Sequence, residues 1–116
     1  MNQLRINVRA DLDIDAEASF IAEKFGVERG IQFYDACEMT FNQLLIYPQI
    51  GKVREFSNIS IEIRRWQVKG FLEYLIFYRL LTHGQNDNRS LTIEVLRIIH
   101  GARDLEMLFQ GEFSVE

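Results

Sequence analysis

Residues 71–104 read FLEYLIFYRLLTHGQNDNRSLTIEVLRIIHGARD, and this stretch decides the fold. Its first part, 71–81, is apolar at both alternating sets of positions, which is typical of a strand in the middle of a sheet. Its second part, 91–100, is rich in branched residues that suit pleated packing. The residues between them, 82–90, are polar and include Gly84, which favours a turn. We therefore predict that the two parts form an antiparallel hairpin.

Four basic side chains lie in or directly after the predicted hairpin, at Arg79, Arg97, His100 and Arg103. Alternation along the strand places Arg97 on one face with Ile93 and Ile99. An ordinary structural role is available for these side chains. Arg97 would cover a sheet edge or pair with a carboxylate such as Glu73. His100 would be a hydrogen-bonded residue at a strand end, and we favour this structural interpretation over a catalytic one.

Upstream of the hairpin the pattern predicts a strand followed by two helices. Apolar residues alternate with arginines as far as Val8, which indicates a short, half-buried first strand. A helix is expected over about 11–25, with acidic residues in its opening turns at the positive end of the helix dipole. A second helix is expected over 28–46, because Pro48 ends it. The expected apolar stripe of the first helix consists of Leu12, Ala16, Phe20, Ile21 and Phe25. The residues expected on a common face of the second helix are Ile31, Tyr34, Cys37 or Glu38, Phe41, Leu44 and Leu45.

A further strand is predicted before the hairpin. Residues 48–58 are interpreted as a connecting loop that carries Lys52 and Arg54. From Ile59 the chain alternates again, with Ile61 and its odd-numbered neighbours facing inward. The sequence therefore predicts an α+β fold: an N-terminal strand, a helical hairpin and a three-stranded antiparallel meander.

Length and composition limit the possible functions. The 116 residues suit one domain spanning the whole chain, and no apolar run is long enough to cross a membrane or to form a signal peptide, so a cytoplasmic location is expected. Cys37, the single cysteine, is interpreted as a small buried residue in a reducing compartment. The His, Cys and Asp residues show no metal-ligand spacing, the glycines form no phosphate-binding loop, and no nucleophile lies beside a base. We expect neither a metal nor a cofactor.

Charge is distributed unevenly along the chain, although the net charge is only -4. Residues 1–50 contain four Lys or Arg against eight Asp or Glu, residues 51–103 contain nine against five, and residues 104–116 contain none against four. This asymmetry predicts one basic and one acidic side. The pI of about 5.2 weighs against a general nucleic-acid binder, so direct nucleic-acid binding is expected to be weak or absent.

Two blocks of the hairpin are familiar. YLIFYR at 74–79 and EVLRIIHGARDLEMLF at 94–109 resemble the closing strands of the RelE/ParE superfamily of type II toxins, and the ParE branch most of all. NVRADLDI at 7–14, LLIYPQIGKVREF at 44–56 and RRWQVKGF at 64–71 resemble earlier parts of the same pattern. The resemblance implies the order β-α-α-β-β-β. It also implies a growth-inhibiting toxin that binds DNA gyrase and is neutralised by a cognate ParD-like antitoxin.

Two alternatives to this non-enzymatic role stay open. One is a RelE-like endoribonuclease, which by the same resemblance would place Arg79, Arg97 and His100 around a phosphate of messenger RNA. The other is a degenerate toxin without a target. An antitoxin would lay a helix in an apolar groove or add a strand to a sheet edge. Trp66 is either such an anchor or a core residue. The residues expected to bind the target or the antitoxin are Arg65, Trp66, Arg79, Arg97, His100 and Arg103.

Overall fold

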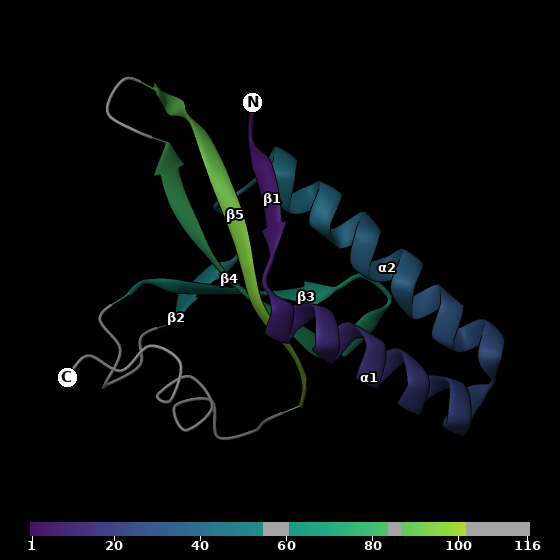
Figure 1. Ribbon diagram of the computed structural model, residues 1–116. Helices are drawn as coiled ribbons and strands as arrows, with labels where there is room; N and C mark the ends of the chain where they lie inside the picture. The colour runs from purple at the N-terminus through teal and green to yellow at the C-terminus, as the bar shows by residue number, and fades with distance from the viewer. Residues whose placement is uncertain (55–60, 84–86, 102–116) are drawn as a thin grey trace.

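The computed structural model describes residues 1–54, 61–83 and 87–101, and its elements follow the predicted order with one additional strand, β2 (Figure 1). Five strands form one sheet in the order β1-β5-β4-β3-β2, in which β1 runs parallel to β5 and all other neighbours are antiparallel. The predicted α+β class is confirmed. The elements are β1 (Gln3–Ile6), α1 (Val8–Phe25), α2 (Val27–Ile46), β2 (Lys52–Arg54), β3 (Ile63–Val68), β4 (Phe71–His83) and β5 (Asp87–His100).

The predicted hairpin is the centre of the sheet. Strands β4 and β5 pair from Tyr74 opposite His100 onward, and the register shifts between Phe77 and Tyr78. This bulge inserts one residue into β5, so that Ile98 rather than Ile99 joins the core under the helices. The prediction that Arg97 shares a face with Ile99 is confirmed, because the two pair with Phe77 and Leu75 on the same face of β4. The prediction that Ile93 shares this face is wrong, because simple alternation does not hold across a bulge.

Both helices cover the same face of the sheet (Figure 1). The core between the layers contains Phe33 and Leu44 from α2 together with Ile76 and Tyr78 from β4. A second buried cluster lies on the opposite face of the sheet and consists of Ile63, Phe77, Leu96 and Ile99. The central strands are thus apolar on both faces, as the sequence predicted.

The first helix begins earlier than expected and buries a different stripe. The side chain of Asn7 caps it by accepting a hydrogen bond of 2.9 Å from the backbone N–H of Ala10, so Val8 belongs to the helix rather than to the first strand. The buried residues are Ala10, Ile14, Ala18 and Ile21, whereas Leu12, Ala16, Phe20 and Phe25 are exposed. Of the predicted stripe, only Ile21 is confirmed.

Close packing of the two helices explains this difference. A Cβ atom on Gly30 of α2 would lie 2.9 Å from the carbonyl oxygen of Ala18, so small residues are needed where the helices meet. On α2, the predicted burial of Cys37, Phe41 and Leu44 is confirmed. The predicted burial of Ile31 and Tyr34 is wrong, since both are exposed.

Strand β2 was not predicted. The hydroxyl of Tyr78 donates to the carbonyl oxygen of Pro48 at 2.8 Å and accepts from the backbone N–H of Gly51 at 2.9 Å. These two hydrogen bonds hold the chain beside β3. Lys52 and Arg54 therefore lie in a strand and not in the predicted loop. The strand predicted before the hairpin starts at Ile59, which lies outside the described residues.

Candidate functional site

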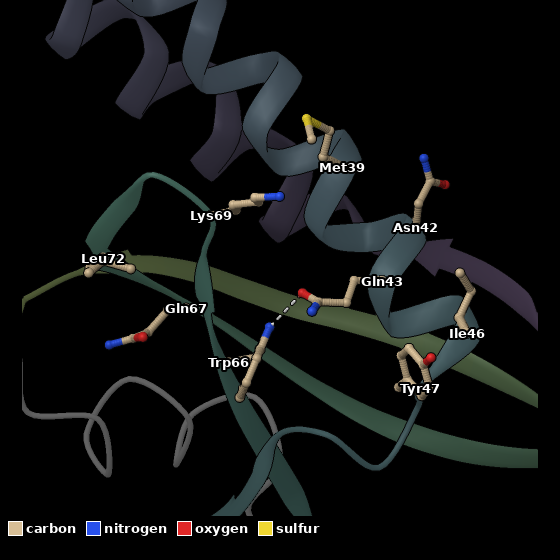
Figure 2. A pocket seen from close by; sticks show the side chains of 9 residues that line it. All are labelled: Met39, Asn42, Gln43, Ile46, Tyr47, Trp66, Gln67, Lys69 and Leu72. Atoms are coloured by element: carbon tan, nitrogen blue, oxygen red, sulfur yellow. Dashed lines mark hydrogen bonds between the residues drawn. The ribbon is translucent and has the colours of Figure 1, made fainter.

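A groove of about 540 Å³ lies between the C-terminal half of α2 and the β3–β4 turn (Figure 2). Four apolar side chains on its walls are largely exposed, and Leu72 is 62% exposed. Contiguous exposed apolar surface of this kind marks a site of protein contact. The groove is lined by Met39, Asn42, Gln43, Ile46, Tyr47, Trp66, Gln67, Lys69 and Leu72.

Hydrogen bonds from α2 to β3 and to the β3–β4 turn hold the groove in shape. The indole Nε1–H of Trp66 donates to Oε1 of Gln43 at 3.0 Å, as the dashed line in Figure 2 shows. The buried hydroxyl of Thr40 accepts from the backbone N–H of Lys69 at 3.0 Å. Gly70 then adopts a φ of 81°, which favours glycine and turns the chain into β4, where Leu72 reaches the groove.

A second hollow extends the apolar surface around the end of α2. It has a volume of about 550 Å³ and shares Gln43, Ile46 and Tyr47 with the groove. Ile50 and Leu91 complete its apolar wall. Because the chain offers aliphatic and aromatic side chains here rather than a cluster of titratable groups, the surface is suited to binding a protein segment.

Cys37 takes no part in this surface. Its side chain is buried, and burial raises the pKa of the thiol to about 12. The thiol is therefore protonated and unreactive at neutral pH, which confirms its expected role as a small core residue.

Arg97 is part of an ion pair within the fold. Its Nε and Nη2 donate to the two carboxylate oxygens of Asp13 on α1 at 2.8 and 3.1 Å, and the backbone N–H of Ile98 donates to the same carboxylate at 3.0 Å. The partner is therefore Asp13 and not the predicted Glu73. Strand β1 pairs with β5 only as far as Val95. Beyond that residue, α1 places the carboxylate of Asp13 beside β5.

Arg79 belongs to a second ion pair, in which Glu94 of β5 lies between Arg5 of β1 and Arg79 of β4. Its Nε donates to Oε1 of Glu94 at 2.5 Å, and the Nε of Arg5 lies 3.7 Å from Oε2 of the same carboxylate. Glu94 is opposite Arg5 on β1 and opposite Arg79 on β4, and it is only 5% exposed. This rung joins three strands.

The remaining predicted residues lie at separate places. His100 is exposed, with Nε2 3.7 Å from Oε2 of Glu73 and its ring 4.8 Å from that of Tyr74. Arg65 lies opposite Lys52, on the face of the sheet away from the helices. Arg103 lies outside the described residues.

The structure therefore does not gather the predicted basic residues that it describes around one point. Three of them are spread along the paired strands β4 and β5 over about 20 Å, at about 3.3 Å per residue: Arg79, Arg97 and His100. Among the predicted residues that the structure describes, only Trp66 lines the groove. Sequence reasoning missed its wall residues Met39 and Leu72, because both were read as ordinary members of a helix or a strand.

Comparison with known proteins decides the family. Residues 4–105 match the family model of the ParE toxin of the type II toxin-antitoxin system parDE. The chain belongs to the ParE toxin family. This membership confirms the predicted ParE branch of the superfamily and makes the chain a toxin of a type II toxin-antitoxin system.

Solved structures support the ParE fold as well. The chain is similar to one in a structure described as the chromosomal ParDE TA system from P. aeruginosa, with a TM-score of 0.63 and 16% sequence identity. The similarity covers 88% of this chain and 98% of the other. No match was found among curated proteins.

Two properties of this ParE-family chain complete the description of the site. Within residues 1–54, 61–83 and 87–101, His, Cys, Asp and Glu side chains form no group of three that could hold a metal ion. None of the helices in the same ranges has the length and apolar character needed to cross a bilayer.

Proposed function

We propose that this chain poisons DNA gyrase by binding it as a protein, without catalytic chemistry of its own. We also propose that a cognate ParD-like antitoxin neutralises it in the cytoplasm. The observation that carries the proposal is the apolar groove between α2 and the β3–β4 turn, in a chain of the ParE toxin family. The choice of gyrase follows the family resemblance.

The groove supports antitoxin binding energetically. Met39, Ile46, Tyr47 and Leu72 are each more than half exposed in the unbound chain. Covering one side chain of this size completely contributes about 1.5–3 kcal/mol, so a segment that covers several of them gains enough to offset its own ordering. Trp66, tied to Gln43, supplies a rigid aromatic wall of the kind that forms interface hot spots.

The positions of the arginines support a non-catalytic mechanism. An endoribonuclease needs several cations converging on one phosphate. Arg79 and Arg97 are instead directed at Glu94 and Asp13, and both carboxylates lie largely inside the fold. We infer that these arginines stabilise the sheet and its contact with α1.

Expression of the chain in cells that lack the antitoxin tests the proposal against its alternatives. Growth should slow, plasmid DNA extracted with detergent should contain gyrase-dependent breaks, and messenger RNA should stay intact. Cut messenger RNA with unbroken plasmid would favour the RelE-like endoribonuclease. Normal growth at a normal protein level would favour a degenerate toxin.

A further inference from the structure

The first helix has a second apolar stripe, on the side away from the sheet. Exposed apolar residues occupy every fourth position there: Val8, Leu12, Ala16 and Phe20. Four residues advance an α-helix by slightly more than one turn, so these side chains form one continuous ridge. The buried residues of α1 lie on a different face, which packs against α2 and β5. The ridge is therefore apolar surface that the fold of one chain leaves open.

The ridge is low at its centre. Ala16 lies midway between the bulkier side chains of Leu12 and Phe20, so a second helix can approach most closely at this methyl group. Ridges formed by residues four apart pack into each other at a crossing angle of about −50°, the commonest class in globular proteins. A crossing at Ala16 leaves Leu12 on one side of the contact and Phe20 on the other, each about one turn away.

Opposite charges flank the two ends of the ridge. Arg9 is exposed on the first turn of α1, and Glu23 is exposed on its last turn. They are separated by about 21 Å along the helix, at about 1.5 Å per residue, so they cannot pair within one chain. Ala16 is also the midpoint between Arg9 and Glu23. A two-fold axis at Ala16 therefore brings each residue of the ridge opposite its counterpart from the other half.

We propose that the chain forms a symmetric dimer in which two α1 helices pair antiparallel and cross at Ala16. Leu12 of each copy packs on Phe20 of the other, because a two-fold contact uses the same surface twice. Arg9 of each copy likewise pairs with Glu23 of the other. A parallel pair would instead bring like charges together at both ends. The ridge is thus complementary to itself in the antiparallel orientation.

The pairing face is separate from the groove. Residues 39–47 and 66–72 supply the lining of the groove (Figure 2). A dimer through α1 therefore keeps both grooves open. One pair of short helices buries less than about 1,200 Å², so the contact belongs to the weak, transient class of interfaces. The inference does not depend on the identity of the target.

Sedimentation equilibrium of the purified chain, at concentrations up to several hundred micromolar, tests the pairing. Leu12→Asp should raise the dissociation constant of the dimer at least about tenfold, because symmetry places a carboxylate against each Phe20 ring. The matched control is Leu72→Asp, in the groove, whose position is as exposed as that of Leu12 (62% and 60%). The control should leave the dissociation constant unchanged.

Exchange of the end charges separates pairing from folding. Arg9→Glu and Glu23→Arg should each raise the dissociation constant about two- to thirtyfold, because each replaces two attractions by two repulsions. The combined variant should restore the original value, since opposite charges face each other again. Both changes suit the helix dipole, so the Tm should not fall. Because the two positions cannot touch within one chain, this rescue requires contact between copies.

A cross-link tests the crossing point. Symmetry places residue 16 of one copy beside residue 16 of the other, so Ala16→Cys should form a disulfide-linked dimer under mild oxidation. Cys37 is buried and does not compete. Asp35→Cys, at an exposed position on α2, should remain monomeric on the same gel. Absence of the Ala16→Cys cross-link in a chain that dimerises would overturn the crossing at Ala16.

Three further results would overturn the inference: a monomer at several hundred micromolar, a dimer that Leu12→Asp leaves intact, or a combined charge variant without rescue. A monomeric chain whose Leu12→Asp variant loses affinity for the antitoxin or for gyrase would assign the ridge to that partner instead. A chain that dimerises as described but leaves gyrase active supports the pairing and contradicts only the proposed target.

Discussion

Removing the carboxylate of Asp13 tests whether Arg97 is a structural residue. The Asp13 carboxylate accepts three hydrogen bonds, two from Arg97 and one from the backbone N–H of Ile98. The side chains of Arg97 and Asp13 are 10% and 17% exposed. Breaking a buried ion pair by removing one partner costs about 3–5 kcal/mol. Because this pair is not fully buried, Asp13→Ala should lower the free energy of unfolding by about 3 kcal/mol.

Denaturant unfolding of the purified chain provides the measurement, with Asp35→Ala as the matched control. Asp35 is an exposed carboxylate on α2, and its removal should change stability by less than about 0.5 kcal/mol. A loss of less than about 1 kcal/mol for Asp13→Ala would refute the reasoning that this pair holds α1 to β5.

A double variant extends the test to function. Asp13→Leu with Arg97→Met replaces the ion pair by apolar side chains, and such replacements are often neutral or stabilising. The double variant should be more stable than Asp13→Ala and should still inhibit gyrase. Loss of toxicity in a well-folded double variant would show that Arg97 acts directly on the target.

Three further predictions concern the groove, the Tyr78 hydrogen bonds and the thiol. Leu72→Asp should weaken antitoxin binding about tenfold or more by calorimetry, whereas Leu12→Asp, at a comparably exposed position on α1 (62% and 60%), should not change it; equal losses would contradict the placement of the site. Gly51→Ala would place a Cβ atom 2.6 Å from the Tyr78 hydroxyl and should lower the free energy of unfolding by about 1–3 kcal/mol, measured in denaturant; unchanged stability would show that the loop shifts freely. Burial raises the pKa of the Cys37 thiol from 9.0 to about 12, so between these pH values the folded chain retains the thiol proton and the unfolded chain loses it. The free energy of unfolding should therefore fall by about 1.4 kcal/mol per pH unit over this range. Cys37→Ala should reduce this slope.

The class of fold was predictable because its determinants are local. Residues 71–81 are apolar on both faces, because β4 contributes side chains to a buried cluster on each face of the sheet. The existence of both helices and the end of the second were also predictable, since Pro48 acts on neighbouring residues, whereas the cap at Asn7 was missed.

The errors arose where tertiary contacts overrule local pattern. Phe20 and Leu12 are bulkier than Ala18, yet Ala18 is buried because Gly30 approaches it closely. The residues that share a face of β5 with Arg97 depend on a bulge, which the sequence pattern does not predict. Strand β2 depends on hydrogen bonds that the Tyr78 hydroxyl, which is distant in the sequence, donates to Pro48 and accepts from Gly51.

The candidate site was only partly predictable for the same reason. Trp66 was named because aromatic anchors are common at interfaces, and it does form a wall of the groove. Leu72 was assigned to the apolar pattern of the central strand. Its exposure follows from its place just after the Gly70 turn, and only the arrangement of α2 against β3 reveals that.

Inhibition of purified gyrase tests the central claim most directly. Purified chain added to gyrase, ATP and relaxed plasmid should prevent supercoiling and leave broken plasmid after detergent treatment. An equimolar amount of the antitoxin should restore supercoiling. Full supercoiling at a large excess of folded chain would contradict the account.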